Sequence, residues 1–311
     1  MKKVLITGSS GFLGKKLTET LQQNGVETVA LSSRTADLTD CHSLARAVDN
    51  PESFDHIFHL AAWTQAGTFC DTHRGIQWIV NQQINTNTLA WWQQYAPQAK
   101  MIAFGTSVSY ASENELVETK YMDGTPYDKF YAYAMCKRML LSGLECLKRQ
   151  YGMNYLYLIP STLYGPGYHT DGRQMHFIYD LIRKILRGKL YNEPVVLWGD
   201  GEQRRELVYI DDFVNIMLQL NTVAANDIYN IGGGIDYSIR DFAGIICDIT
   251  GYDCNLIQYD NTQYVGARSK ILSVEKYKSK LPVQPPATSL RDGIARTIEW
   301  LEEQKQIFLA K

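Results

Sequence analysis

One tyrosine and one lysine in this chain have the spacing of an acid–base pair. Tyr133 and Lys137 are four residues apart, so in a helix both side chains project from the same face. A free tyrosine has a pKa of about 10 and is a poor acid–base group at neutral pH. A lysine cation one turn away favours the phenolate, and we expect Lys137, together with the positive charge of an oxidised cofactor, to lower the pKa of Tyr133.

A hydroxyl residue is expected beside this pair. Lys100 to Thr106 is an apolar run of strand length, and Phe130 to Gln150, which contains Tyr133, is the next helical segment along the chain. The hydroxyl of Thr106, at the end of that strand, can then converge on Tyr133. Together the two residues would orient a substrate oxygen and exchange a proton with it.

The first fourteen residues predict the element that positions a cofactor. An apolar run from Lys3 meets a glycine-spaced loop, and a helical pattern from Phe12 to Leu21 follows at once. This entry to a βαβ unit is typical of nucleotide binding, because glycines permit a tight turn and a close approach to a pyrophosphate at the helix N-terminus. The spacing is GxxGxxG and not GxGxxG, so its weight depends on the segments around it. We assign cofactor contacts to Gly8, Ser10, Gly11, Phe12, Leu13 and Gly14.

The segment after the second expected strand, Val26 to Leu31, bears on the type of cofactor. An NAD-binding unit usually has Asp or Glu at this point, whereas this chain offers two serines and Arg34. An arginine would bind a 2'-phosphate that a carboxylate would repel, so we expect NADP(H) in preference to NAD(H). Taken alone, Arg34 is equally compatible with a solvated loop charge. Ala61 and Ala62 follow the third strand, where a cofactor must pass close to the backbone.

The order of segments predicts an α/β fold with a Rossmann-type, doubly wound parallel sheet. Strand-like and helix-like segments alternate through the first half and become irregular after the turn at residues 164–167. We expect residues 1–165 to form mainly an NAD(P)-binding domain. Residues 166–311 would form mainly a smaller, mixed α/β substrate lobe, with some segments returning to the sheet.

Composition narrows the class of protein. The chain has 311 residues, a formal net charge of −2 and no blocks of basic residues, which argues against nucleic acid or anionic membranes as partners. The apolar run after Lys2 and Lys3 is too short for a signal peptide, and no stretch reaches membrane-spanning length, so we expect a cytoplasmic enzyme. The six cysteines show no metal-ligand spacing and are expected to be reduced thiols without a metal.

Taken together, several motifs resemble the extended short-chain dehydrogenase/reductase family of NAD(P)-dependent nucleotide-sugar epimerases, dehydratases and reductases. They are residues 7–14, Asp37-Leu38, residues 59–62, Thr106, and Tyr133 with Lys137. The resemblance implies that Thr106, Tyr133 and Lys137 are catalytic and that the enzyme is a homodimer formed through the helical segments 76–95 and 130–150. It also adds cofactor contacts from Asp37, Leu38, Leu60, Asn85, Tyr133, Lys137 and Pro160.

Within that family the likeness is greatest to the GDP-L-fucose synthases, in residues 149–152, 163–166, 196–201 and 205–212. It implies that His176 is an acid–base group for epimerisation. A fucose synthase has a cysteine two residues after the catalytic Ser or Thr, whereas this chain has Val108, which cannot transfer a proton. Ser107 and Val108 likewise supply no Asp-Glu pair of the kind that sugar 4,6-dehydratases use, so dehydration is not expected.

A nucleotide-sugar substrate requires cations for its diphosphate. Arg205 is the strongest candidate, since a guanidinium matches phosphate oxygens. Trp198 could border the nucleotide or belong to the core. The remaining candidate substrate-binding residues are Ser107, Thr162, Lys184 and Arg268.

These observations lead to one favoured hypothesis and two alternatives. We predict an NADPH-dependent reductase of a nucleotide-linked 4-keto-6-deoxy sugar in deoxysugar biosynthesis, with at most one C3 or C5 epimerisation through His176. The alternatives are an NAD-dependent nucleotide-sugar epimerase and a non-catalytic, NADP-binding sensor or scaffold. The presence of all three of Thr106, Tyr133 and Lys137 counts against the sensor, which would not need them.

Overall fold

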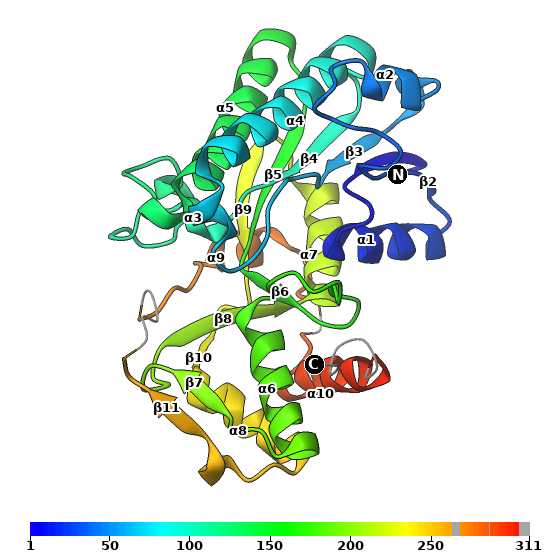
Figure 1. Ribbon diagram of the computed structural model, residues 1–311. Coiled ribbons are helices and arrows are strands. Elements are labelled where there is room, and N and C mark those ends of the chain that lie inside the picture. Colours follow the sequence, from blue (N-terminus) through cyan, green and yellow to red (C-terminus); the bar gives the residue numbers. More distant parts are fainter. Residues whose placement is uncertain (263–267, 286, 305–311) are drawn as a thin grey trace.

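A computed structural model describes residues 1–262, 268–285 and 287–304. The chain forms two lobes, which Figure 1 shows one above the other. The upper one, here called the Rossmann lobe, contains a six-stranded sheet in which every neighbouring pair is parallel, in the order β2-β1-β3-β4-β5-β9. Its strands are β1 (Lys3–Thr7), β2 (Glu27–Leu31), β3 (His56–His59), β4 (Lys100–Phe104), β5 (Tyr155–Pro160) and β9 (Asp227–Ile231).

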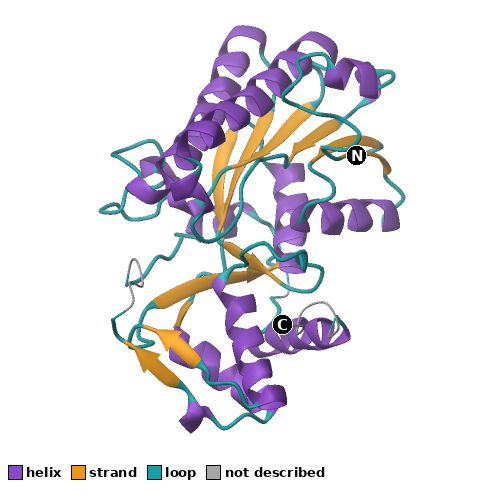
Figure 2. Cartoon of the chain, in the orientation of Figure 1, coloured by secondary structure: helices purple, strands orange, loops and turns teal. Residues whose placement is uncertain are grey.

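Helices cover both faces of this sheet (Figure 2). Because side chains alternate along a strand, Val4 and Ile6 pack on one face and Leu5 on the other. The first face is covered by α1 (Phe12–Gln23) and α7 (Ile210–Val223), and the second by α2 (Ser43–Ala47), α4 (Arg74–Tyr95) and α5 (Tyr131–Tyr151). The predicted doubly wound Rossmann fold is confirmed.

The adjacent tryptophans of α4 differ from what the sequence suggests. Two neighbouring residues point to different sides of a helix, which predicts that one of the pair is core and the other is covered by a partner subunit. Both Trp91 and Trp92 are buried within this chain. Trp92 donates from its indole nitrogen to the carbonyl of Ala99, and Trp91 packs in the same core, because the chain after α4 turns back over the helix end. Neither indole needs a partner subunit to cover it.

The second lobe is built from short strands and three longer helices. Strands β10 (Asp236–Ser238), β8 (Arg204–Tyr209) and β6 (Thr162–Tyr164) form one sheet, and β11 (Gln258–Asp260) pairs with β7 (Val196–Trp198). Helices α6 (Phe177–Tyr191), α8 (Ile239–Thr250) and α10 (Leu290–Glu303) enclose an apolar core of their own. The remaining helices are α3 (Phe69–Thr72) and α9 (Glu275–Lys280), with short 3-10 turns η1 (Pro51–Ser53), η2 (Ser107–Ser109), η3 (Glu118–Lys120), η4 (Asp128–Phe130) and η5 (Cys254–Leu256).

The chain crosses between the lobes more than once. After β8 it returns to the Rossmann lobe for α7 and β9, and then re-enters the second lobe at β10. Within the residues that the structure describes, no helix has both the length and the apolar character to cross a membrane.

Candidate active site

The glycine loop after β1 is built for a close approach of backbone to backbone. Gly8 has φ +74°, and a Cβ added there would lie 2.7 Å from the amide nitrogen of Ala61. A Cβ on Gly14 would lie 2.2 Å from the carbonyl oxygen of Gly8. Helix α1 then starts at Phe12 with Gly11 as its N-cap and no side chain to satisfy its first N–H groups. These free donors and the missing side chains fit the pyrophosphate of a dinucleotide cofactor.

The loop after β2 lies next to this glycine loop. The N–H of Ser9 donates to the carbonyl of Leu31, at 2.9 Å, which brings the exposed Arg34 to the same edge of the sheet. Further along, the Asp37 carboxylate accepts from the N–H and the hydroxyl of Thr39, and the buried Leu38 follows it. A guanidinium at this place can bind a ribose 2'-phosphate.

A buried chain of hydrogen bonds runs beneath the loop. Thr7 Oγ1 lies 2.9 Å from Nδ1 of His59, and Nε2 of His59 lies 3.2 Å from Oδ1 of Asn85. The Asn85 amide in turn donates to the carbonyl of Cys136, at 3.4 Å. Because Asn85 Oδ1 only accepts, Nε2 of His59 must donate, so Nδ1 accepts from Thr7. These hydrogen bonds link β1, β3, α4 and α5. Through them the side chain of Asn85 is bound to the carbonyl of Cys136, the residue before Lys137.

Helix α5 presents Tyr133 and Lys137 on one face, as their spacing predicts. The Lys137 amine lies 5.7 Å from the centroid of the Tyr133 ring, and Lys137 is buried. Burial lowers the pKa of Lys137 to about 8. Burial also raises the pKa of Tyr133 above its usual value, with smaller contributions from Cys70 and neighbouring groups. In the chain without a cofactor, loss of water around the phenol therefore dominates the pKa of Tyr133. The lowering expected when an oxidised cofactor adds its positive charge stays a prediction. Tyr133 is a neutral phenol at neutral pH.

Thr106 caps η2 at the end of β4, and α5 holds this turn in place. The Ser109 hydroxyl donates to the carbonyl of Ala134, at 3.1 Å. Arg138, next to Lys137, is buried without a carboxylate partner among the described residues and donates to backbone carbonyls instead: those of Ser109, Met122, Asp123 and Gly124. The Tyr157 hydroxyl donates to the carbonyl of Lys137, at 2.7 Å, and lies 3.2 Å from that of Tyr121. The geometry of Thr106 relative to α5 is thus fixed from both sides.

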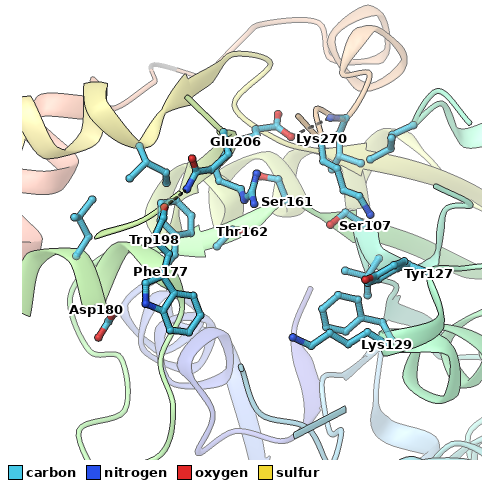
Figure 3. A pocket seen from close by; sticks show the side chains of 18 of the residues that line it. Ser107, Tyr127, Lys129, Ser161, Thr162, Phe177, Asp180, Trp198, Glu206 and Lys270 are labelled. Carbon is cyan, nitrogen blue, oxygen red and sulfur yellow. Dashed lines mark hydrogen bonds between the residues drawn. The ribbon is translucent and has the colours of Figure 1, made fainter. Parts of the chain in front are cut away.

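A cavity of about 680 Å³ opens between the lobes (Figure 3). Five of the predicted substrate-binding residues line it: Ser107, Thr162, Lys184, Trp198 and Arg205. Arg268 is exposed and lies outside the lining, whereas Lys270, two residues further on, is part of it. Ser107 and Phe177 bring the cavity next to Thr106 and His176, although the side chains of Thr106, Tyr133 and His176 are not themselves in its wall.

His176 lies directly before α6, and its side chain is exposed at the surface. Desolvation by the surrounding protein lowers the pKa of His176 below its usual value, and the nearby His169 adds to the effect. The positive end of α6 acts in the same direction. The imidazole is therefore neutral at neutral pH and able to accept a proton. Val108 lines the cavity and offers no second proton-transfer group.

Several polar residues that line the cavity are not predicted from the sequence. Lys129, Ser161, Gln203 and Glu206 join Lys270 in the wall. Ser161 Oγ and Gln203 Oε1 are buried, and neither atom forms a hydrogen bond within the described part of the chain. Gln203 and Glu206 lie within two residues of Arg205, and Lys129 lies four residues before Tyr133. Their proximity in sequence to predicted site residues could have indicated that they belong to the site. Ser161 and Lys270 have no comparable local pattern.

The comparisons with known proteins agree with this arrangement. The model of the NAD dependent epimerase/dehydratase family matches residues 4–232. The chain belongs to that family. Dependence on NAD, which the name of the family states, agrees with a glycine loop that fits a dinucleotide. The resemblance to the extended short-chain dehydrogenase/reductase family is confirmed.

Individual members of the family are similar over their whole length. GDP-L-fucose synthase of Escherichia coli is 27% identical over 99% of this chain and 98% of its own. GDP-L-colitose synthase of Yersinia pseudotuberculosis is 26% identical over 97% of this chain and 99% of its own. A GDP-L-fucose synthetase of Naegleria fowleri, solved bound to NADP, has the same fold, with a TM-score of 0.84, 21% identity and 99% and 96% coverage.

Proposed function

We propose that this member of the family is an NADPH-dependent reductase of a nucleotide-linked 4-keto-6-deoxy sugar, acting in deoxysugar biosynthesis. The observation that carries the proposal is the set of Thr106, Tyr133 and Lys137, held together by α5 beside a cavity rich in cations. Its support from relatives is the similarity to synthases of GDP-L-fucose and GDP-L-colitose along the entire chain.

NADPH, when bound along the glycine loop with Arg34 at its 2'-phosphate, supplies a hydride. Thr106 would hydrogen-bond the sugar carbonyl and orient it toward Tyr133. Tyr133, as a neutral phenol, would donate its proton to the oxygen that becomes the alcohol. Lys137 would hold the cofactor ribose and stabilise the phenolate that Tyr133 leaves behind.

Epimerisation, within this proposal, is limited to one proton-transfer group. The neutral imidazole of His176 can remove a proton next to a ketone, because its lowered pKa leaves it unprotonated at neutral pH. Val108 cannot return a proton from the opposite face. We therefore expect reduction with at most one exchange event at C3 or C5.

The test is incubation with NADPH and a panel of nucleotide 4-keto sugars in deuterated water. Oxidation of NADPH without deuterium at C3 or C5 indicates a pure reductase, and deuterium there indicates that His176 takes part. Epimerisation without net NADPH oxidation would instead establish the NAD-dependent epimerase alternative. Tyr133→Phe should lower kcat at least about a hundredfold while preserving the Kd for NADPH. Full turnover in that variant would contradict the mechanism, and no turnover with any substrate would favour the sensor.

We further propose a cytoplasmic homodimer. All six cysteines are free in the structure, as expected for a reducing compartment. Ile76, Trp78 and Ile79 on α4 and Met139 on α5 are exposed apolar side chains on the two helices that the family resemblance assigns to the dimer. Light scattering of the purified chain, with Ile79→Asp as the disrupting variant, tests this assembly.

A further inference from the structure

Lys129 is a half-buried cation in the cavity wall that the acid–base chemistry leaves unused. It belongs to η4, the short turn that leads into α5, and so comes from the Rossmann lobe. Figure 3 shows its side chain pointing into the cavity from the wall opposite Trp198. Lys129 forms no ion pair with any residue in the described part of the chain, and its amine lies 5.9 Å from the centroid of the Phe130 ring.

The turn that carries Lys129 is fixed in position. The Arg74 guanidinium bridges Asp128 on η4, at 2.8 Å, and Asp71 on α3, at 2.5 Å. The N–H of Phe130 donates to the carbonyl of Tyr127, at 2.9 Å, which closes the turn. These exposed ion pairs contribute little stability. They do connect η4, which carries Lys129, to α3 and α4.

The charge of the cavity wall is unbalanced. Four cationic side chains line it, against two acidic ones, so the wall has a formal excess of two positive charges: Lys129, Lys184, Arg205 and Lys270 against Asp180 and Glu206. Burial raises the pKa of Glu206 to about 7, so its carboxyl carries less than a full negative charge at neutral pH. Lys184 is paired with Asp180, at 3.2 Å. The Glu206 carboxylate instead accepts the N–H groups of Gly234 and Leu272.

A ligand with two negative charges offsets that excess. The two phosphates of a nucleotide sugar carry one negative charge each, and such a ligand would give Lys129 the ion-pair partner that it lacks among the described residues. Arg205 approaches from β8 of the second lobe, and Lys270 lies close enough for the Arg205 charge to lower the pKa of Lys270 further than burial alone does. Lys129 faces the same space from the other lobe, one helical turn before Tyr133.

We propose that Lys129 binds the diphosphate of the substrate together with Arg205 of the second lobe, so that the anion connects the two lobes beside the reacting sugar. The inference rests on the proposed nucleotide-sugar substrate and adds a specificity-determining residue to it. A cation in this place favours substrates with a diphosphate over uncharged sugars. It also makes substrate affinity depend on the relative position of the lobes.

Titration calorimetry with GDP and UDP, and with the uncharged nucleosides guanosine and uridine, tests the proposal. Lys129→Met should weaken nucleoside diphosphate binding about tenfold and leave nucleoside and NADPH affinity unchanged, because only the phosphates lose a charge-assisted bond. Lys129→Arg should retain most of the affinity. Lys120→Met is the matched control, since it removes a lysine from the same connecting segment outside the cavity lining.

The outcomes separate this inference from the proposed function. If the wild-type protein binds neither diphosphate, nor any other in an extended panel, the nucleotide-sugar function fails and the assignment of Lys129 fails with it. If the wild type binds and Lys129→Met binds equally well, the assignment alone is overturned, even where the KM for a sugar substrate changes. An equal loss of nucleoside affinity would indicate an altered cavity shape and would also overturn it. Lys129→Gln provides a second neutral variant should the methionine variant lose NADPH affinity through misfolding.

Discussion

The buried imidazole of His59 predicts that part of the stability of this protein is lost in mild acid. The side chain is fully buried between Thr7 and Asn85. Burial, with a smaller contribution from the charge of Lys137, lowers the pKa of His59 from 6.5 to about 4. The unfolded chain binds a proton below about pH 6.5, whereas the folded protein does not until about pH 4. The contribution of His59 is therefore complete above pH 6.5 and is lost as the pH falls toward 4.

The size of the effect follows from the two pKa values. A full loss corresponds to about 3 kcal/mol of unfolding free energy, of which about 2 kcal/mol is lost between pH 7 and pH 5. The matched variant is His59→Gln, which can still donate to Asn85 but does not titrate. At pH 7 it should be less stable than the wild type by about 1–3 kcal/mol, because the Thr7 hydroxyl loses its buried acceptor.

Urea unfolding of both proteins between pH 7 and pH 5, followed by circular dichroism and tryptophan fluorescence, measures this difference. We expect the stability gap between wild type and variant to narrow by about 2 kcal/mol over that range. The pKa of His56 is also lowered to about 4 by burial, but His56 is present in both proteins and cancels in the comparison. Parallel stability curves would refute the argument, since they would mean that His59 does not change its proton affinity on folding.

Three other predictions follow from the same structure. Arg34→Glu should raise the Kd for NADPH about ten- to a hundredfold and change that for NADH far less, as fluorescence titration with both cofactors would reveal. Gly14→Ala should abolish cofactor binding and lower the melting temperature, because its Cβ would lie 2.2 Å from the Gly8 carbonyl oxygen, whereas Gly11→Ala, at 3.2 Å, should lower the melting temperature much less. Val108→Cys adds a thiol to the cavity wall, and mass spectrometry of the product in deuterated water should detect more deuterium than with the wild type if His176 removes a proton there.

The parts of the site that depend on one element could be predicted from the sequence. Tyr133 and Lys137 share a face because four residues make about one helical turn, whatever surrounds the helix. Gly8 and Gly14 are required by the backbone approach that follows a nucleotide-binding strand. Strand β9 was not predicted, because its five residues include Asp227 and Asn230, and its place in the sheet comes from pairing with β5.

The parts that depend on tertiary contacts could not be read in this way. Lys270 reaches the cavity because the Leu272 N–H binds the buried Glu206, a partner 66 residues away. The raised pKa of Tyr133 also has a tertiary cause, since the loss of water that raises it depends on which residues pack around the phenol. Sequence spacing gives the distance between two charges along a helix and says nothing of the water they lose.

The protonation states of the site favour one direction of the proposed reaction. Reduction of a ketone consumes a proton at the new alcohol, and the group that supplies it must hold that proton beforehand. Burial keeps Tyr133 protonated and leaves Lys137, with a pKa of about 8, largely charged at neutral pH. After the proton is given up, that charge stabilises the phenolate, so Lys137 acts on the product of the step more than on its start. Alcohol oxidation needs the phenolate at the outset, which the raised pKa of the half-buried Tyr133 disfavours. At neutral pH the chain's own residues therefore hold the proton that reduction consumes, in agreement with the affinity for NADPH that Arg34 predicts.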